Sequence, residues 1–404
     1  MGSRVQALTL DVEKDYWDKE NCTEVLNLSR PDLVRDIHRG YFEAGADMVQ
    51  TNSFGGSPIT LGEFELEDRA FEINKIAGEL AREAAESFAD GRTRYVVGSI
   101  GPGTKLPSLG NIAYDPLEEA LFVQSQGLLA GGVDAILIET CQDTLQIKAA
   151  VNGAKRALTK AGSGIPIFVQ VTVETTGTLL VGPDIAAAAT VINALDVPLM
   201  GLNCATGPQE MAEHVRYLSQ NWPGLISVQP NAGLPELVDG KTHYPLGGPE
   251  MASWVERFVA EDGVNLVGGC CGTSIPHIQA LDAMLKRLGN PRPAPVARKY
   301  FWVPSVASLY GAVPLRRTAI FQSVSAATPM VQKNGANCRK PAIGMVAWRW
   351  AASRWPNAHT ATPASIGWPT AALIRLPRAC DAATRTKATS VNSALRCWSA
   401  RGGA

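Results

Sequence analysis

The sequence lacks the features that define several large classes of protein. No apolar run approaches the roughly 18 residues of a membrane-spanning helix, and the opening MGSRVQALTLDVEKDYW has no signal-peptide segment. Only 8 cysteines occur in 404 residues, too few for a disulfide scaffold. The 5 histidines show neither an HExxH motif nor paired spacing. We therefore expect a cytoplasmic protein with free thiols and no membrane partner.

Acidic residues are almost absent from the last part of the chain. The whole chain has 37 basic and 38 acidic residues, a nearly neutral balance. Residues 315–404 contain 13 Lys and Arg but one acid, Asp381, together with five of the nine tryptophans. The preceding 314 residues consequently carry an acidic excess of 13. The two parts are unlike in composition and are interpreted separately.

Short apolar, β-branched runs alternate with amphipathic stretches through the acidic part. The runs are 47–54, 94–102, 134–140, 165–174, 199–204, 225–231 and 264–271. The stretches that predict helices are 31–45, 65–89, 116–130, 143–161, 184–195, 208–220, 248–261 and 276–288. Because the interiors of the runs are apolar throughout, they are typical of parallel strands buried on both faces. The alternation, without a Gly-rich dinucleotide motif, predicts an α/β protein with a (β/α)8 TIM-type barrel. Residues 1–30 contain no such run, so we expect the barrel to lack its first strand.

Polar or reactive residues end each predicted strand, among them Glu139 and a set of cysteines. The carboxyl ends of barrel strands converge on the face that carries the active site, so these residues are expected to be neighbours. Cys204 ends one strand, and Cys270 and Cys271 end another. Three thiolates are good zinc ligands and leave the fourth position of a tetrahedron open, as in catalytic sites. The adjacent pair can reach one ion only if the backbone turns, which the flanking glycines permit.

Two alternatives to metal binding remain open for the cysteines. A lone buried Cys is more often a small apolar side chain than a ligand, and we interpret Cys22 and Cys141 in this way. A vicinal disulfide between Cys270 and Cys271 is a weaker option because the expected compartment is reducing.

A substrate thiol entering the open position of a zinc site would lose its proton near neutral pH. Zinc sites that activate water for hydrolysis usually have nitrogen or carboxylate ligands, so three cysteine ligands favour activation of a thiol instead.

At these residues the sequence resembles the homocysteine S-methyltransferase family. The motifs are TNSF (51–54), ILIET (136–140), GLNCA (201–205), PNAGLP (230–235) and GGCCGT (268–273). Within the family the chain is most similar to the homocysteine-binding module of cobalamin-dependent methionine synthases, up to about residue 316. The resemblance implies zinc on Cys204, Cys270 and Cys271, with the homocysteine sulfur as fourth ligand.

The same resemblance implies a substrate pocket and partners. Glu139 would receive the homocysteine ammonium, and Asn231 would stand near zinc and could occupy the open position without substrate. The alternatives are a carboxylate satisfied by neighbouring amides for Glu139 and a turn residue for Asn231. Methylcobalamin on a partner module would donate the methyl group, giving methionine, and cobalamin-binding and folate-binding modules would be the partners. Betaine or S-methylmethionine is the alternative donor, and an inactive zinc-binding fragment is the alternative to an enzyme.

The sequence departs from the family at both ends. The family has a first strand ending in a DGAMGT-like motif whose Asp contacts the substrate amine. This chain resembles a sequence that begins at the Met within that motif. We expect a misplaced or truncated start. Residues 1–292 are predicted to form the barrel, 293–316 a linker and 317–404 a basic tail of low order. A frameshift explains the tail composition best. A basic arm for nucleic acid would carry a recognisable binding module, and a disordered linker should be poor in aromatic residues.

Overall fold

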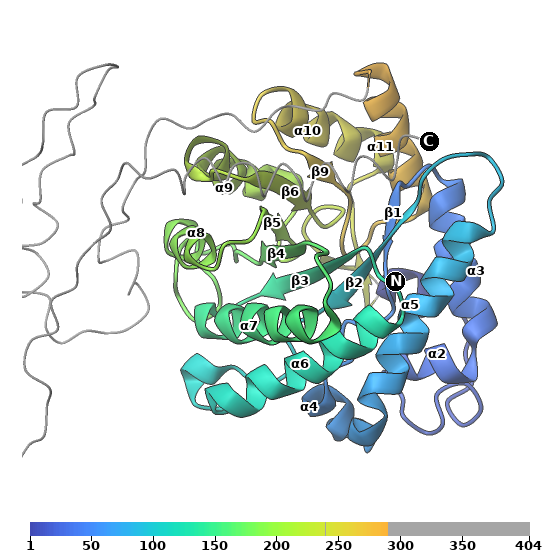
Figure 1. Cartoon of the computed structure of the whole chain (residues 1–404). Helices are drawn as coiled ribbons and strands as arrows, with labels where there is room; N and C mark the ends of the chain where they lie inside the picture. The colour runs from blue at the N-terminus through green and yellow to red at the C-terminus, as the bar shows by residue number, and fades with distance from the viewer. Residues whose placement is uncertain (239, 290–404) are drawn as a thin grey trace, which may run out of the picture. The chain divides into compact units, whose positions relative to one another are not determined.

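Seven parallel strands form one curled sheet in the computed structural model, which describes residues 1–238 and 240–289. Each strand pairs with the next in the order β1-β2-β3-β4-β5-β6-β9, and helices cover the outer face of the curl (Figure 1). The strands are β1 Met48–Gln50, β2 Tyr95–Ile100, β3 Ala135–Cys141, β4 Ile167–Val171, β5 Leu199–Asn203, β6 Leu225–Gln229 and β9 Leu266–Val267. The prediction of a barrel-type α/β fold with seven strands is confirmed.

The connections between strands are helical, as the amphipathic stretches predict. The helices are α1 Gly2–Gln6, α2 Leu26–Ser29, α3 Pro31–Glu43, α4 Pro58–Leu61, α5 Ala70–Glu86, α6 Tyr114–Ala130, α7 Thr144–Ala161, α8 Ile185–Ala194, α9 Pro208–Asn221, α10 Gly248–Ala260 and α11 Ile275–Arg287. Short 3-10 helices lie at Thr23–Val25, Gly62–Phe64, Glu67–Arg69 and Pro107–Leu109. In the part of the chain described, no helix has the length and hydropathy needed to cross a membrane.

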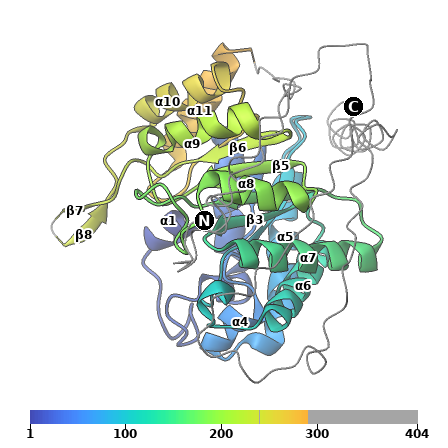
Figure 2. The same cartoon turned by 90° about the vertical axis from the view of Figure 1, so that its left-hand side faces the viewer.

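A two-stranded antiparallel hairpin, β7 Glu236–Val238 and β8 Lys241–His243, was not predicted. It projects from the body of the molecule between β6 and α10 (Figure 2). The side chains of β7 are all exposed, with Leu237 at 79%. Because no face of β7 is buried, it leaves no alternation of apolar and polar residues for a sequence pattern to detect.

Alternate residues of each strand face opposite sides of the sheet. Outward residues such as Val96, Ile136 and Val169 pack beneath the helices in the largest apolar cluster. Their neighbours face the interior of the curl and form a second apolar cluster, with Val97, Leu137, Phe168 and Leu199 among its members. This alternation is the two-residue period of a strand. The interior is apolar at the amino ends of the strands.

The interior becomes polar toward the carboxyl ends of the strands. Two residues beyond the apolar layer, Ser99 follows Val97, Glu139 follows Leu137 and Gln170 follows Phe168. The Gln170 side-chain amide donates a 3.0 Å hydrogen bond to Ser227 Oγ. Polar side chains are costly to bury unless they have partners or a ligand, so this end of the sheet is the part suited to binding.

The sheet edges bear on the predicted missing strand. Within residues 1–238 and 240–289, β1 pairs only with β2, and β9 pairs only with β6. The first 30 residues form helical segments and no strand. The predicted linker 293–316 and tail 317–404 lie outside the described residues, so both remain predictions.

Candidate metal centre

Three cysteine sulfurs meet at the carboxyl ends of β5 and β9. Cys204 Sγ lies 3.8 Å from Cys271 Sγ, and Cys270 Sγ lies 4.0 Å from Cys271 Sγ. All three lie within 4.8 Å of one another, and the described residues contain no other such group of His, Cys, Asp or Glu. The structure therefore brings together the three cysteines on which the zinc prediction depends.

The turn after β5 holds Cys204 in an unusual backbone conformation. Cys204 has φ of 63° and Ala205 has φ of 57°, both in the left-handed region that non-glycine residues seldom occupy. Such a residue costs on the order of 1–3 kcal/mol, and neighbouring contacts must hold it. The Cys204 N–H donates a 3.2 Å hydrogen bond to the Gln229 carbonyl of β6, and its own carbonyl accepts one of 2.7 Å from Thr206 N–H. This turn directs the sulfur toward the second pair of cysteines.

The turn after β9 places both adjacent cysteines on one side. The Cys270 N–H donates to the Pro230 carbonyl at 2.8 Å, and the Cys271 carbonyl accepts from Ala232 N–H at 2.9 Å. Gly272, with φ of 76°, reverses the chain immediately afterward. A side chain there would be strained and would also overlap Tyr244. The glycine predicted to permit this turn is therefore required by it.

Asn231 supports the same turn from the loop after β6. Its Oδ1 accepts a 3.1 Å hydrogen bond from the Cys271 N–H, and the side chain is buried. Asn231 is not among the residues that line the neighbouring cavity. The structure thus places it beside the sulfur cluster, with its carbonyl oxygen already engaged by the backbone of Cys271.

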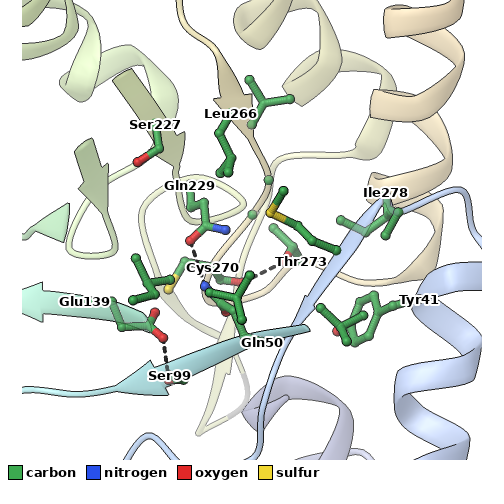
Figure 3. A pocket seen from close by; sticks show the side chains of 18 of the residues that line it. Tyr41, Gln50, Ser99, Glu139, Ser227, Gln229, Leu266, Cys270, Thr273 and Ile278 are labelled. Atoms are coloured by element: carbon green, nitrogen blue, oxygen red, sulfur yellow. Dashed lines mark hydrogen bonds between the residues drawn. The ribbon is translucent and has the colours of Figure 1, made fainter. Parts of the chain in front are cut away.

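Glu139, at the end of β3, lies near Cys270 in the wall of the same pocket (Figure 3). Its Oε1 accepts a 2.5 Å hydrogen bond from Ser99 Oγ, and its Oε2 lies 3.5 Å from Asn203 Nδ2. Burial raises the pKa of the Glu139 carboxyl to about 7, and the Ser99 hydrogen bond opposes part of that shift. A buried carboxyl of this kind is suited to a cationic partner that would restore its charge.

Asn203 joins the two halves of the site. The same Nδ2 that faces Glu139 lies 3.9 Å from Cys270 Sγ, and its Oδ1 accepts a 2.8 Å hydrogen bond from Thr140 N–H. Thr172 Oγ1 donates to the Asn203 carbonyl at 2.9 Å. Ser99 and Asn203 both lie near the ends of predicted strands, but the sequence did not predict that they would join Glu139 and the sulfurs in one network.

A cavity of about 640 Å³ connects Glu139 with the cysteines. Cys204, Cys270 and Cys271 line it together with Ser99, Glu139 and Thr140. It continues into the curl past Gln50 and Gln229, whose side chains share a 3.0 Å hydrogen bond. Pockets of roughly 300–1,000 Å³ accommodate small molecules, so an amino acid could reach the carboxyl and the sulfurs together.

The distances and donor chemistry fit a zinc ion. A zinc ion about 2.3 Å from each sulfur places the sulfurs of a tetrahedral site about 3.8 Å apart, close to the Sγ–Sγ separations of 3.8 and 4.0 Å in the structure. Hydrogen bonding with Cys204 and Cys271, together with burial, raises the pKa of the Cys270 thiol, whereas hydrogen bonding with Cys204 and Cys270 lowers that of Cys271. Because three close thiolates repel one another, a cation is needed for all of them to ionise together.

The remaining cysteines and histidines of the described region have different surroundings. Cys22 and Cys141 are buried, and burial raises the pKa of both thiols, that of Cys22 to about 12. His277 caps α11 through Ser274 and contacts the Leu246 carbonyl at 2.9 Å. His38 is buried in α3. The burial of Cys22 and Cys141 agrees with their interpretation as small apolar side chains.

Comparison with known proteins gives one consistent result. The family model described as homocysteine S-methyltransferase matches residues 1–285. The chain is 48% identical over 320 residues to a methionine synthase of Mycobacterium tuberculosis, and 47% identical over 317 residues to that of Mycobacterium leprae. These matches cover 79% and 78% of this chain but 26% of each relative, so the chain spans about a quarter of their length.

Solved structures show the same fold. The metallated form of the homocysteine methyltransferase MmuM from Escherichia coli superposes with a TM-score of 0.56 at 21% identity, covering 70% of this chain and 93% of that one. Its apo form gives a TM-score of 0.50 at 20% identity, covering 67% and 92%. The resemblance seen in the five sequence motifs is confirmed.

Proposed function

Because the chain belongs to the homocysteine S-methyltransferase family, we propose that it holds zinc on Cys204, Cys270 and Cys271 and methylates homocysteine to methionine. The observation that carries the proposal is a group of three sulfurs within 4.8 Å of one another, two of whose separations match a zinc site, in the wall of a cavity that a buried carboxyl also lines. A thiol and an ammonium are the two groups that such a pocket would bind, and both belong to homocysteine.

The metal and the protein would contribute different parts of the chemistry. Bound zinc would lower the pKa of the homocysteine thiol in its remaining position, supplying a thiolate near neutral pH. Glu139 would receive the ammonium, and that positive charge would lower the raised pKa of the carboxyl and keep it ionised. Ser99 and Asn203 would orient the carboxylate through their contacts with its two oxygens.

Asn231 has two roles in the proposal. Its hydrogen bond to the Cys271 backbone would hold the turn that presents two of the three thiolates. Rotation of the side chain away from that backbone would allow its oxygen to take the open metal position when homocysteine is absent. The first role is supported by the 3.1 Å contact, and the second extends the family resemblance to this residue.

Methylcobalamin is the proposed methyl donor. The curated relatives are methionine synthases of which this chain spans about a quarter, which supports the existence of further modules in such proteins. Cobalamin-binding and folate-binding modules are the proposed partners, with the first presenting the methyl group to the thiolate. Proximity would then replace a bimolecular encounter with a reaction between two held groups.

Metal analysis combined with three donor assays tests the proposal. We expect about one zinc per chain in the purified reduced protein, and methionine formation from homocysteine with added methylcobalamin. Cys204→Ala should lose both zinc and turnover, whereas the matched variant Cys141→Ala should keep both, because Cys141 lies outside the sulfur cluster. Turnover with betaine or S-methylmethionine alone would reject the cobalamin donor. Stoichiometric zinc without any turnover would identify an inactive zinc-binding fragment.

A further inference from the structure

The end of β3 contains a bulge at Glu139. The pairing of β3 with β4 shifts between Ile138 and Cys141, so that β3 has one residue more than β4 in this interval. An extra residue of this kind bends a strand and redirects the side chains beside it. Glu139 and Thr140 both line the cavity, although neighbouring residues of a regular strand face opposite sides. The bulge therefore sets the direction of the carboxyl.

The backbone of the bulge is strained at Thr140. Its φ is 56°, in the left-handed region where a β-branched residue is a clear outlier. Such a conformation costs on the order of 1–3 kcal/mol and persists only where the surroundings hold it. A threonine with this backbone therefore needs a partner that compensates the strain.

The side chain of Asn203, at the end of β5, is that partner. Its Oδ1 accepts a 2.8 Å hydrogen bond from the Thr140 N–H, and its Nδ2 donates a 2.8 Å hydrogen bond to Thr140 Oγ1. Asn203 is only 1% exposed, and its own carbonyl accepts a 2.9 Å hydrogen bond from Thr172 Oγ1. It is not among the residues that line the cavity. Asn203 therefore holds the bulge from behind the cavity wall.

Asn203 also links the bulge to the sulfur cluster. The Asn203 Nδ2 lies 3.5 Å from Glu139 Oε2 and 3.9 Å from Cys270 Sγ. Cys204, which carries another of the three sulfurs, follows Asn203 directly in the chain. The carboxyl is thus positioned through hydrogen bonds of Asn203, and the Cys204 sulfur through its peptide bond. One buried residue therefore sets the separation between the two halves of the site.

We propose that the contact between Asn203 and Thr140 makes the site selective for the length of an amino thiol, with Asn203 as a positioning residue. The inference rests on the proposed function, because it requires a thiol at the metal and an ammonium at Glu139. A ligand must reach both groups at once. L-cysteine is one methylene shorter than L-homocysteine and reaches only one of them when their separation is fixed. One missing methylene is worth roughly 10- to 200-fold in discrimination.

Thiol binding to the cobalt-substituted protein tests this selectivity. Co²⁺ replaces zinc in tetrahedral sites, and its visible absorption changes when a further thiolate binds. Dissociation constants of L-homocysteine and L-cysteine would be measured for wild type, Asn203→Ala and Thr140→Val. Thr140→Val keeps the shape of the side chain and removes the acceptor of the Asn203 amide. Asn152→Ala is the control, because that amide donates a 2.8 Å hydrogen bond to Tyr114 and neither residue lines the cavity.

We expect wild type and Asn152→Ala to prefer L-homocysteine by roughly tenfold or more, the lower end of the effect of one methylene. Asn203→Ala should lower this ratio of dissociation constants toward one, and Thr140→Val should lower it by a smaller factor. A general loss of structure would weaken the binding of both thiols alike, so the ratio reports the positioning role and the single affinities do not.

A wild-type ratio in Asn203→Ala would overturn the proposal, and so would equal affinities for the two thiols in the wild-type protein. If Asn203→Ala does not take up Co²⁺, the ratio in Thr140→Val decides in its place, and an unchanged value would overturn the proposal. A wild-type cobalt spectrum that neither thiol alters would instead contradict the proposed function, because no thiol would then reach the metal.

Discussion

Glu139→Gln changes one buried carboxyl into an amide of the same shape and gives a prediction with a defined sign. The pKa of Glu139 is about 7 in the folded protein, against an ordinary value of 4.5, because burial disfavours its charge. Its side chain is only 6% exposed, so solvent screening is slight. A shift of about 2.5 units corresponds to roughly 3 kcal/mol at 1.36 kcal/mol per unit.

The direction follows from proton binding. Between pH 4.5 and 7 the folded state keeps the Glu139 proton more often than the unfolded state does, so the free energy of unfolding falls as pH rises through this interval. Above pH 7 the full cost of the buried charge is present. Glutamine has no such proton, and its oxygen can still accept the Ser99 hydrogen bond. Glu139→Gln should therefore match wild type near pH 4.5 and exceed its stability by about 3 kcal/mol at pH 8.

Urea unfolding of reduced, metal-free protein at several pH values measures this difference. An exposed carboxyl on α9, changed in Glu213→Gln, provides the control and should parallel wild type at every pH. If Glu139→Gln also runs parallel to wild type from pH 4.5 to 8, the carboxyl does not have the buried environment described here. In that case its proposed role as receptor of the substrate ammonium would lose its electrostatic basis.

Three further predictions concern other parts of the molecule. Burial lowers the pKa of the His38 imidazole from 6.5 to about 3, so below pH 6.5 the unfolded state binds a proton that the folded state does not. The free energy of unfolding therefore falls as the pH drops from 6.5 toward 3. His38→Leu should therefore gain about 3 kcal/mol relative to wild type between pH 6.5 and 4.5 in urea unfolding, and a constant difference would refute this. Asn231→Ala removes the acceptor of the Cys271 N–H, so zinc binding should weaken roughly tenfold in a competition with a chelator. An affinity equal to that of wild type would exclude the supporting role of Asn231. Cys141→Ala removes a buried sulfur, so thermal unfolding should show a loss of stability on the order of 1 kcal/mol, with the zinc content unchanged. A reduced zinc content would contradict the assignment of the metal to the other three cysteines.

The sequence patterns were sufficient for the strands and the major helices because both faces of the sheet are covered. Runs such as 134–140 are apolar at nearly every position, and the structure buries the matching strand β3 almost completely. The meeting of Cys204 with Cys270 and Cys271 followed from the single rule that parallel strands end on one face. Zinc binding by these three thiols remains a proposal, which their residue type supports.

Other features depend on contacts that no local pattern encodes. The hairpin β7–β8 is exposed along β7, so that strand has no buried face to produce a periodic signal. Tyr244, which follows that hairpin, packs against Gly272, and no motif links the two residues. The left-handed backbone at Cys204 likewise depends on partners in β6 that are distant in sequence. Residues 290–404 lie outside the described part of the chain, and the interpretation of the tail remains a prediction.

X-ray absorption at the zinc edge tests the central claim most directly, because it counts sulfur ligands around the ion. The purified zinc protein should show three sulfur ligands and one lighter ligand, at about 2.3 Å for sulfur. Addition of L-homocysteine should raise the count to four sulfurs, whereas L-homoserine, which lacks the thiol, should leave it at three. A sulfur count that does not change with homocysteine, or that is below three without it, would contradict a thiol-binding zinc centre formed by Cys204, Cys270 and Cys271.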